Sequence, residues 1–213
     1  MTKEQLKGIY AITDPKLMEQ DFLSKTEQAI LGGIKILQYR NKTASLEQQE
    51  KEALTLAALC KKNNVVFIIN DNIELAIKVN ADGVHLGQHD THLQQARKLL
   101  GENKIIGITC NNKIELAQTA QQQGANYVAF GRFFNSLTKP SAPAAELSLL
   151  SEARQFITIP IVAIGGITPD TASLLIEKGA DMLAVIHGIF GQEDALKATR
   201  QFVEIIDSPQ VSV

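Results

Sequence analysis

Two carboxylates, Asp71 and Asp90, stand just beyond short apolar segments of the chain, among amide and hydroxyl side chains. Asp71 follows the run VVFIIN (65–70), and Asp90 follows GVHL (83–86) after a short polar linker. Two carboxylates that leave positions open for water and phosphate oxygens suit Mg²⁺, which commonly binds one or two protein carboxylates together with a substrate phosphate. Asp is also a favoured N-cap residue, so either side chain could instead cap the helix that follows it.

Three cations lie near polar segments of the same kind. Arg40 ends an apolar run, Lys42 follows two residues later, and Lys139 lies in the segment SLTK. Arg offers a planar fork to a phosphate and Lys a mobile point charge, so with a metal ion they would hold a pyrophosphate. Taken singly, each could be an ordinary solvated charge. Gln38 shares the direction of Arg40 by the two-residue period of a strand, and it could donate to a bound heterocycle, a phosphate or a loop carbonyl.

The elements that must position these side chains follow a regular alternation. Short apolar runs rich in Ile and Val, typical of strands buried on both faces of a parallel sheet, are separated by amphipathic stretches at helical spacing. The predicted strands are 8–13, 34–40, 65–70, 83–86, 105–109, 127–131, 161–165 and 182–186. The predicted helices are 23–31, 46–62, 73–79, 93–100, 113–123, 147–156, 171–178 and 195–206.

Eight strand-helix units predict an α/β fold of the (β/α)₈ TIM barrel type, as a single domain over residues 1–213 with a polar tail at about 207–213. An open doubly wound sheet is the main rival, but no Gly-x-Gly-x-x-Gly follows the first strand. A weak internal echo supports the repetition, because similar tripeptides each close a helix and open a strand: Gly32-Gly33-Ile34, Asn80-Ala81-Asp82, Gly124-Ala125-Asn126 and Gly179-Ala180-Asp181.

Barrel enzymes carry their chemistry at the carboxyl ends of the strands, so the barrel hypothesis brings the polar residues above to one rim. The turns at 163–169 (AIGGITP) and 186–188 (IHG) fall after the seventh and eighth strands, the usual phosphate site of barrels. Their glycines let backbone N–H groups approach an anion, although any tight turn can use paired glycines. His85 is expected inside the barrel as a hydrogen-bonded residue, and Asn72 as a helix cap.

Composition excludes several classes of function. The chain has 213 residues, of which 45% are hydrophobic and 21% charged, and a formal net charge of −2. A net charge this close to zero creates no overall electrostatic field that would attract nucleic acid or an anionic membrane. No stretch resembles a signal peptide or a membrane span. We expect a cytoplasmic protein that binds neither. The four His lack the spacing of zinc ligands, and Cys60 and Cys110 are expected to be buried small hydrophobes.

Six segments together resemble, in order and spacing, the motifs of the thiamine phosphate synthase family. They are YAITD (10–14), QYRNK (38–42), IND (69–71), ADGVHLGQHD (81–90), SLTK (136–139) and VAIGGI (162–167). The resemblance covers essentially the whole chain and implies a (β/α)₈ barrel and a homodimer. It also implies a transferase that condenses hydroxymethylpyrimidine pyrophosphate with a thiazole phosphate, usually carboxylated, to give thiamine phosphate and pyrophosphate, plus CO₂ from the carboxylated substrate.

The resemblance also implies roles for individual residues. Asp71 and Asp90 would carry Mg²⁺, and Arg40, Lys42 and Lys139 would act on the leaving pyrophosphate. The pyrimidine pyrophosphate would be held by Gln38, Arg40, Lys42, Asn70, Thr109 and Lys139, and the thiazole phosphate by Ser136, Thr138, Gly166, Ile186 and His187. The chain departs from the commonest family pattern at four positions, where Thr109 stands for Ser, Ser136 for Thr, Arg132 for Pro and His187 for Ser.

Two other functions fit the pattern less well. The related thiazole tautomerase is similar in fold but uses a His in the loop after the fifth strand, where this chain has Thr109-Cys110-Asn111-Asn112. The other alternative is a non-catalytic phosphate-binding protein of the thiamine pathway, which the complete set of metal-ligand candidates makes less attractive.

Overall fold

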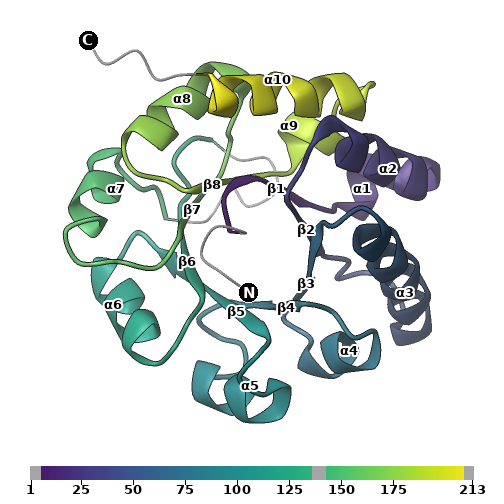
Figure 1. The fold of residues 1–213 in the computed structure, drawn as a ribbon, viewed down its shortest axis with the longest axis horizontal. Coiled ribbons are helices and arrows are strands. Elements are labelled where there is room, and N and C mark those ends of the chain that lie inside the picture. The colour runs from purple at the N-terminus through teal and green to yellow at the C-terminus, as the bar shows by residue number, and fades with distance from the viewer. Residues whose placement is uncertain (1–5, 136–142, 209–213) are drawn as a thin grey trace.

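The computed structural model describes residues 6–135 and 143–208 of the chain, and its centre is a closed barrel of eight parallel strands. Each strand pairs with its neighbour in sequence, and β1 pairs with β8 to close the ring (Figure 1). The predicted (β/α)₈ barrel is therefore confirmed, and an open sheet is excluded. The strands are β1 Gly8–Ile12, β2 Ile36–Tyr39, β3 Val66–Asn70, β4 Gly83–Leu86, β5 Ile105–Asn111, β6 Tyr127–Phe130, β7 Ile161–Ile164 and β8 Met182–Val185.

Helices form a ring outside the strands (Figure 1). The eight predicted ones are present with small shifts at their ends: α2 Phe22–Gly32, α3 Leu46–Lys62, α4 Ile73–Lys78, α5 Leu93–Leu100, α6 Ile114–Gln122, α7 Ser148–Ala153, α8 Pro169–Glu177 and α10 Ala195–Asp207. No helix in the described part of the chain combines the length and apolar character that crossing a bilayer requires.

Three short elements were not expected: α1 Pro15–Met18, the 3₁₀ turn η2 Glu19–Asp21 and α9 His187–Phe190. The Asp14 side chain accepts from Lys16 N–H at 3.0 Å, and Pro15 is preset for a first helical turn, so α1 forms from local chemistry. Helices of four residues contain only about one turn and leave no apolar period to detect. The tail predicted at about 207–213 begins where α10 ends, and residues 209–213 lie outside the described residues.

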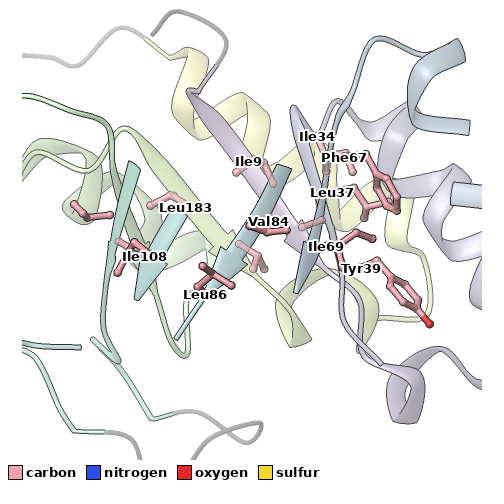
Figure 2. Close-up of a cluster of buried hydrophobic side chains, with 14 of the residues drawn as sticks. Ile9, Ile34, Leu37, Tyr39, Phe67, Ile69, Val84, Leu86, Ile108 and Leu183 are labelled. Carbon is pink, nitrogen blue, oxygen red and sulfur yellow. The ribbon is translucent and has the colours of Figure 1, made fainter. Parts of the chain in front are cut away.

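Alternate residues of each strand face two separate cores, as the two-residue period requires. Outward-facing residues pack beneath the helices, and Figure 2 shows part of this layer, with Ile9, Leu37, Phe67 and Val84 among the labelled side chains. Inward-facing residues fill the barrel itself. The buried members of this inner core are Leu6, Tyr10, Ile12, Ile36, Val66, Ile68, Ile105, Tyr127, Ala129, Val162, Met182 and Ala184.

A glycine makes room for one of the two tyrosine rings of the inner core. Gly107 on β5 pairs in register with Tyr127 on β6, and a Cβ at Gly107 would lie only 1.9 Å from Cζ of the Tyr127 ring. Only a residue without a side chain leaves this space open. The Tyr127 ring consequently lies across β5, stacked on His85 of β4 with ring centroids 5.6 Å apart.

The internal echo in the sequence has a structural cause at the amino-terminal rim of the barrel. In three of the four tripeptides the last residue is Asp or Asn, and its side chain accepts from the backbone N–H at the start of the preceding strand. These bonds join Phe67 to Asp82, Ile106 to Asn126 and Ile161 to Asp181, at 2.8, 2.8 and 2.7 Å. Arg97 also donates to Asn126, and Arg154 to Asp181. The repeat therefore ties β3 to β4, β5 to β6 and β7 to β8 at this rim.

This tie predicts a graded response at Asp181. Asp181→Ala removes the acceptor that the Ile161 N–H and the Arg154 guanidinium share, and the unpaired donors should lower the free energy of unfolding by about 1–3 kcal/mol. Asp181→Asn keeps an oxygen acceptor, as Asn126 does at the equivalent position, and should cost less than half as much. Urea unfolding measures both, with exposed Glu27→Ala as a control expected within about 0.5 kcal/mol of the unchanged protein. Equal losses for Ala and Asn would contradict the proposed tie.

Candidate active site

A cavity of about 650 Å³ opens at the carboxyl ends of the barrel strands. The residues predicted from the sequence meet there from several strands, although Ser136, Thr138 and Lys139 lie outside the described residues. The predicted residues that line the cavity are Gln38, Arg40, Lys42, Asn70, Asp71, Asp90, Thr109, Gly166, Ile186 and His187. The expected convergence at one rim is therefore observed for all of the described candidates.

Arg40 is held at this rim by its backbone. The buried hydroxyl of Thr13, just past the end of β1, accepts from Arg40 N–H at 2.8 Å and donates to Arg40 O at 3.1 Å. Lys42 follows in a loop that Asn41 organises. The Asn41 side chain accepts from two loop N–H groups and donates to Glu52 of α3 at 3.0 Å. Two independent anchors thus place the two cations beside the cavity.

Neither Asp71 nor Asp90 is a helix cap. Asn72 caps α4 by accepting from Leu75 N–H at 2.9 Å, as expected, and His92 occupies the N-cap position of α5. Asp71 has a left-handed backbone with φ of 61°, a conformation that few residues other than Gly adopt without a local cause. Its N–H is held by the carbonyl of His85 at 2.9 Å, so the ladder between β3 and β4 continues to this residue. Both carboxylates are therefore left to the cavity.

The two carboxyl groups perturb one another. Burial by itself would raise the pKa of Asp71, but hydrogen bonds with Lys42 and Asp90 outweigh burial and lower the pKa below its ordinary value. Burial and the hydrogen bond with Asp71 raise the pKa of Asp90, although the Gly87 N–H, which donates to Asp90 at 2.7 Å, opposes the increase. Lys42 Nζ lies 2.8 Å from Asp71 Oδ2. Negative charge is thus concentrated at one point and only partly compensated.

This donor set fits Mg²⁺. Both candidates are carboxylates, and they line an open cavity that has room for water and phosphate oxygens, the combination that Mg²⁺ commonly takes. Among the described residues no group of three or more His, Cys, Asp or Glu side chains gathers as a metal site would require, so an all-protein cage for zinc is not formed there.

The glycine turn after β7 serves packing as well as the cavity. Gly165 and Gly166 both have positive φ, and a Cβ on Gly166 would lie 2.3 Å from the carbonyl oxygen of Asn135. The segment after β6 crosses at this point, where Phe134 N–H donates to Gly165 O at 3.0 Å. Gly166 and His187, which begins α9, line the cavity near the N-terminus of α8, whose partial positive charge favours an anion.

The sequence interpretation missed the tyrosines of the site. Tyr10 lines the cavity and Tyr127 is fully buried beside it, and His85 hydrogen bonds to both Tyr127 and Thr109, which confirms the expected interior position of His85. The alternation of residues along β1 and β6 places Tyr10 and Tyr127 inside the barrel, and this period could have identified them from the sequence. Lys197 also lines the cavity, from α10, and no sequence motif indicated it.

The ion pair between Lys42 and Asp71 gives a testable titration. Lys42→Met should raise the pKa of Asp71, because burial remains while the hydrogen bond and positive charge of Lys42 are lost. Carboxyl ¹³C NMR titration without divalent cations measures the change, and exposed Lys16→Met is the control. In the unchanged protein the lowered pKa makes Asp71 stabilise the fold above its unfolded-state pKa, and this contribution is lost as pH falls through the folded-state pKa. Identical Asp71 titration in both variants would contradict the pairing.

Known proteins similar to this chain agree with the geometry. The family model described as thiamine monophosphate synthase matches residues 9–189. A thiamine-phosphate synthase of Alcanivorax borkumensis is 51% identical over 195 residues, covering 91% of this chain and 90% of the relative. A thiamine-phosphate synthase of Thioalkalivibrio sulfidiphilus is 45% identical over 207 residues, covering 97% and 98%.

A solved structure extends the similarity to three dimensions. The thiamine phosphate pyrophosphorylase from Pyrococcus furiosus superposes with a TM-score of 0.88 at 32% identity, covering 96% of this chain and 97% of that one. The family match spans most of the sequence and includes every described residue predicted for the site. The chain therefore belongs to the thiamine monophosphate synthase family.

Proposed function

We propose that this protein is a transferase that joins hydroxymethylpyrimidine pyrophosphate to a thiazole phosphate, releasing pyrophosphate and forming thiamine phosphate. With a carboxylated thiazole substrate, CO₂ is also lost. The observation that carries the proposal is the meeting of Asp71, Asp90, Lys42 and Arg40 at one side of a cavity large enough for organic substrates. Family membership supports the same reaction.

The protein's own groups suit a leaving pyrophosphate. Arg40 offers two parallel N–H donors to phosphate oxygens, and Lys42 a mobile ammonium beside them. Asp71 and Asp90 would hold Mg²⁺, which supplies positive charge to the departing pyrophosphate when it is bound. Lys139, by family resemblance, adds a third cation. Fixed positive groups stabilise the charge that develops as the carbon–oxygen bond breaks, and they are already in place before it does.

The rest of the reaction needs positioning more than proton transfer. The electron-rich pyrimidine supports a carbocation at its methylene carbon once pyrophosphate leaves, and the thiazole nitrogen then attacks that carbon. Gln38, Asn70 and Thr109 would orient the pyrimidine. The thiazole phosphate would meet the turns after β7 and β8, where Gly166, Ile186 and His187 line the cavity, and by family resemblance Ser136 and Thr138. A dissociative displacement of this kind does not require a strong protein base.

The two alternatives are less well supported. In the tautomerase-like reading a His is needed after β5, but Thr109, Cys110 and Asn111 belong to that strand and Cys110 is fully buried. A purely binding protein would not need paired carboxylates beside two cations.

The homodimer implied by the resemblance and the cytoplasmic location remain predictions.

A coupling assay tests the proposed reaction. Purified protein, pyrimidine pyrophosphate, thiazole phosphate and Mg²⁺ should release pyrophosphate and form thiamine phosphate, and chelation of the metal with EDTA should stop both. Chromatography identifies the product, and an enzymatic pyrophosphate assay gives the rate. Release that does not depend on the thiazole phosphate, or no release at all, would refute the proposal.

The metal ligands can be tested separately. Asp71→Asn and Asp90→Asn should each lower kcat by about 10²-fold or more at saturating Mg²⁺, because the charge that stabilises the leaving group is lost. Asp14→Asn is the matched control, since Asp14 lies past β1 but does not line the cavity, and an Asn can still accept from Lys16 N–H. Near-normal turnover of both site variants would remove the carboxylates from the mechanism. Circular dichroism checks that each variant is folded.

A further inference from the structure

A continuous line of hydrogen bonds crosses the floor of the cavity and links five strands. Gln38 Nε2 donates to Tyr10 Oη at 2.7 Å, Tyr10 Oη lies 2.7 Å from Tyr127 Oη, Tyr127 Oη lies 3.0 Å from His85 Nδ1, and His85 Nε2 lies 2.8 Å from Thr109 Oγ1. Each distance is within the ordinary range for a hydrogen bond. The five residues come from β2, β1, β6, β4 and β5. All of them except Tyr127 line the cavity.

 Tyr127 is the fully buried link beneath the cavity wall.

One assignment of the protons gives each of the three inner members of the line, Tyr10, Tyr127 and His85, one donor and one acceptor partner along it. In this assignment Gln38 donates to Tyr10, Tyr10 donates its single hydroxyl proton to Tyr127, and Tyr127 donates its own to His85 Nδ1. An Nδ1 that accepts belongs to a neutral imidazole with its proton on Nε2, which then donates to Thr109 Oγ1. With the protons assigned in this way, every bond points in the same direction, from Gln38 to Thr109.

The surroundings keep this line in its neutral form. Tyr10 is 1% exposed and Tyr127 fully buried, so bulk water cannot replace either phenol oxygen as a partner. Burial also raises the pKa of both phenols well above the ordinary value, and each keeps its proton. A buried hydrogen-bond network of this kind has little freedom to reverse one member alone, because that would leave two donors or two acceptors facing each other.

We propose that Tyr10, Tyr127 and His85 are positioning residues that set opposite polarity at the two ends of this line, a carbonyl acceptor on Gln38 and a hydroxyl donor on Thr109, and thereby select an aminopyrimidine. The Gln38 amide donates an N–H to Tyr10, so its Oε1 is presented to the cavity as an acceptor. Thr109 accepts from His85, so its hydroxyl proton can be donated to a ligand. An aminopyrimidine offers the complement, since its exocyclic amino group donates and its ring nitrogens accept. The inference rests on the proposed function for the identity of the ring.

The same polarity rejects the corresponding 4-oxo pyrimidine. A carbonyl in place of the amino group faces the Gln38 oxygen, so two acceptors meet, and the protonated ring nitrogen next to it no longer accepts. A site whose buried polar groups are left unpaired by an analogue discriminates strongly against that analogue. The line would thus make substrate choice depend on residues that need not touch the substrate.

The test compares the 4-amino and 4-oxo forms of hydroxymethylpyrimidine as ligands in calorimetric titrations, and their pyrophosphates as substrates. The unchanged protein should prefer the amino form by at least about 10²-fold in both measurements. Tyr127→Phe removes one link and leaves Gln38 and Thr109 in place, so the preference should fall below about 10-fold, with kcat falling as well as KM rising. His85→Phe should act similarly, and His85→Gln, which keeps an acceptor and a donor, should restore part of the preference.

Thr26→Val is the matched control, because Thr26 is buried and its hydroxyl donates to Phe22 O at 2.8 Å. This hydrogen bond involves no residue of the line. It should lose thermal stability and keep the full preference. Equal binding of the two pyrimidines by the unchanged protein, or a preference that survives Tyr127→Phe, would overturn the inference and leave the line a structural feature only. A preserved binding preference without any pyrophosphate release would instead reject the proposed function while supporting the polarity of the line.

Discussion

Parallel pairing of β1 with β8 is the constraint on which the rest of the molecule depends. Gly8 to Ala11 lie in register with Met182 to Val185, and this last ladder turns a row of eight strands into a ring. Once the ring is closed, the carboxyl end of every strand lies on one rim. Side chains more than a hundred residues apart, such as Tyr10 and Tyr127, then come within hydrogen-bonding distance.

Because the strand ends lie close together at this rim, charged and hydrogen-bonding side chains from several strands are concentrated there. Asp71 and Asp90 follow adjacent strands, and their mutual interaction moves their pKa values in opposite directions. Lys42 compensates for one of the two charges, because its loop is held by Asn41 and Glu52. A site arranged in this way is prepared for a cation and for anions before any ligand arrives, and such preorganisation is the main source of electrostatic stabilisation in enzymes.

The opposite rim has a different task. Asp82, Asn126 and Asp181 accept from N–H groups in the first two residues of β3, β5 and β7, and so give these backbone donors a partner. The similar tripeptides in the sequence are therefore the trace of a structural repeat and carry no catalytic role in our reading. This division agrees with the general separation in barrels between a stability face and a catalytic face.

Much of this architecture could be predicted from local patterns. Apolar runs and helical periods identified eight strands and eight helices, because both kinds of element are dictated mainly by which side chains must be buried. The short helices α1 and α9 were missed because four residues carry no period. The described site residues were predicted from strand ends and family motifs. For Asp71 and Asp90 the sequence allowed either a metal ligand or a helix cap, and the structure excluded the cap because Asn72 and His92 occupy the N-cap positions of α4 and α5.

The sequence by itself determined the barrel, the rim on which the site lies and the chemical types of its residues, since these follow from periodicity and order along the chain. Only the tertiary structure decided which side chains share a proton or a charge. Gly107 is an unremarkable strand glycine until its register opposite Tyr127 is known, and that space lets one line of hydrogen bonds run from Gln38 to Thr109. Contacts of this kind depend on distances between different strands, and no local pattern in a single sequence records them.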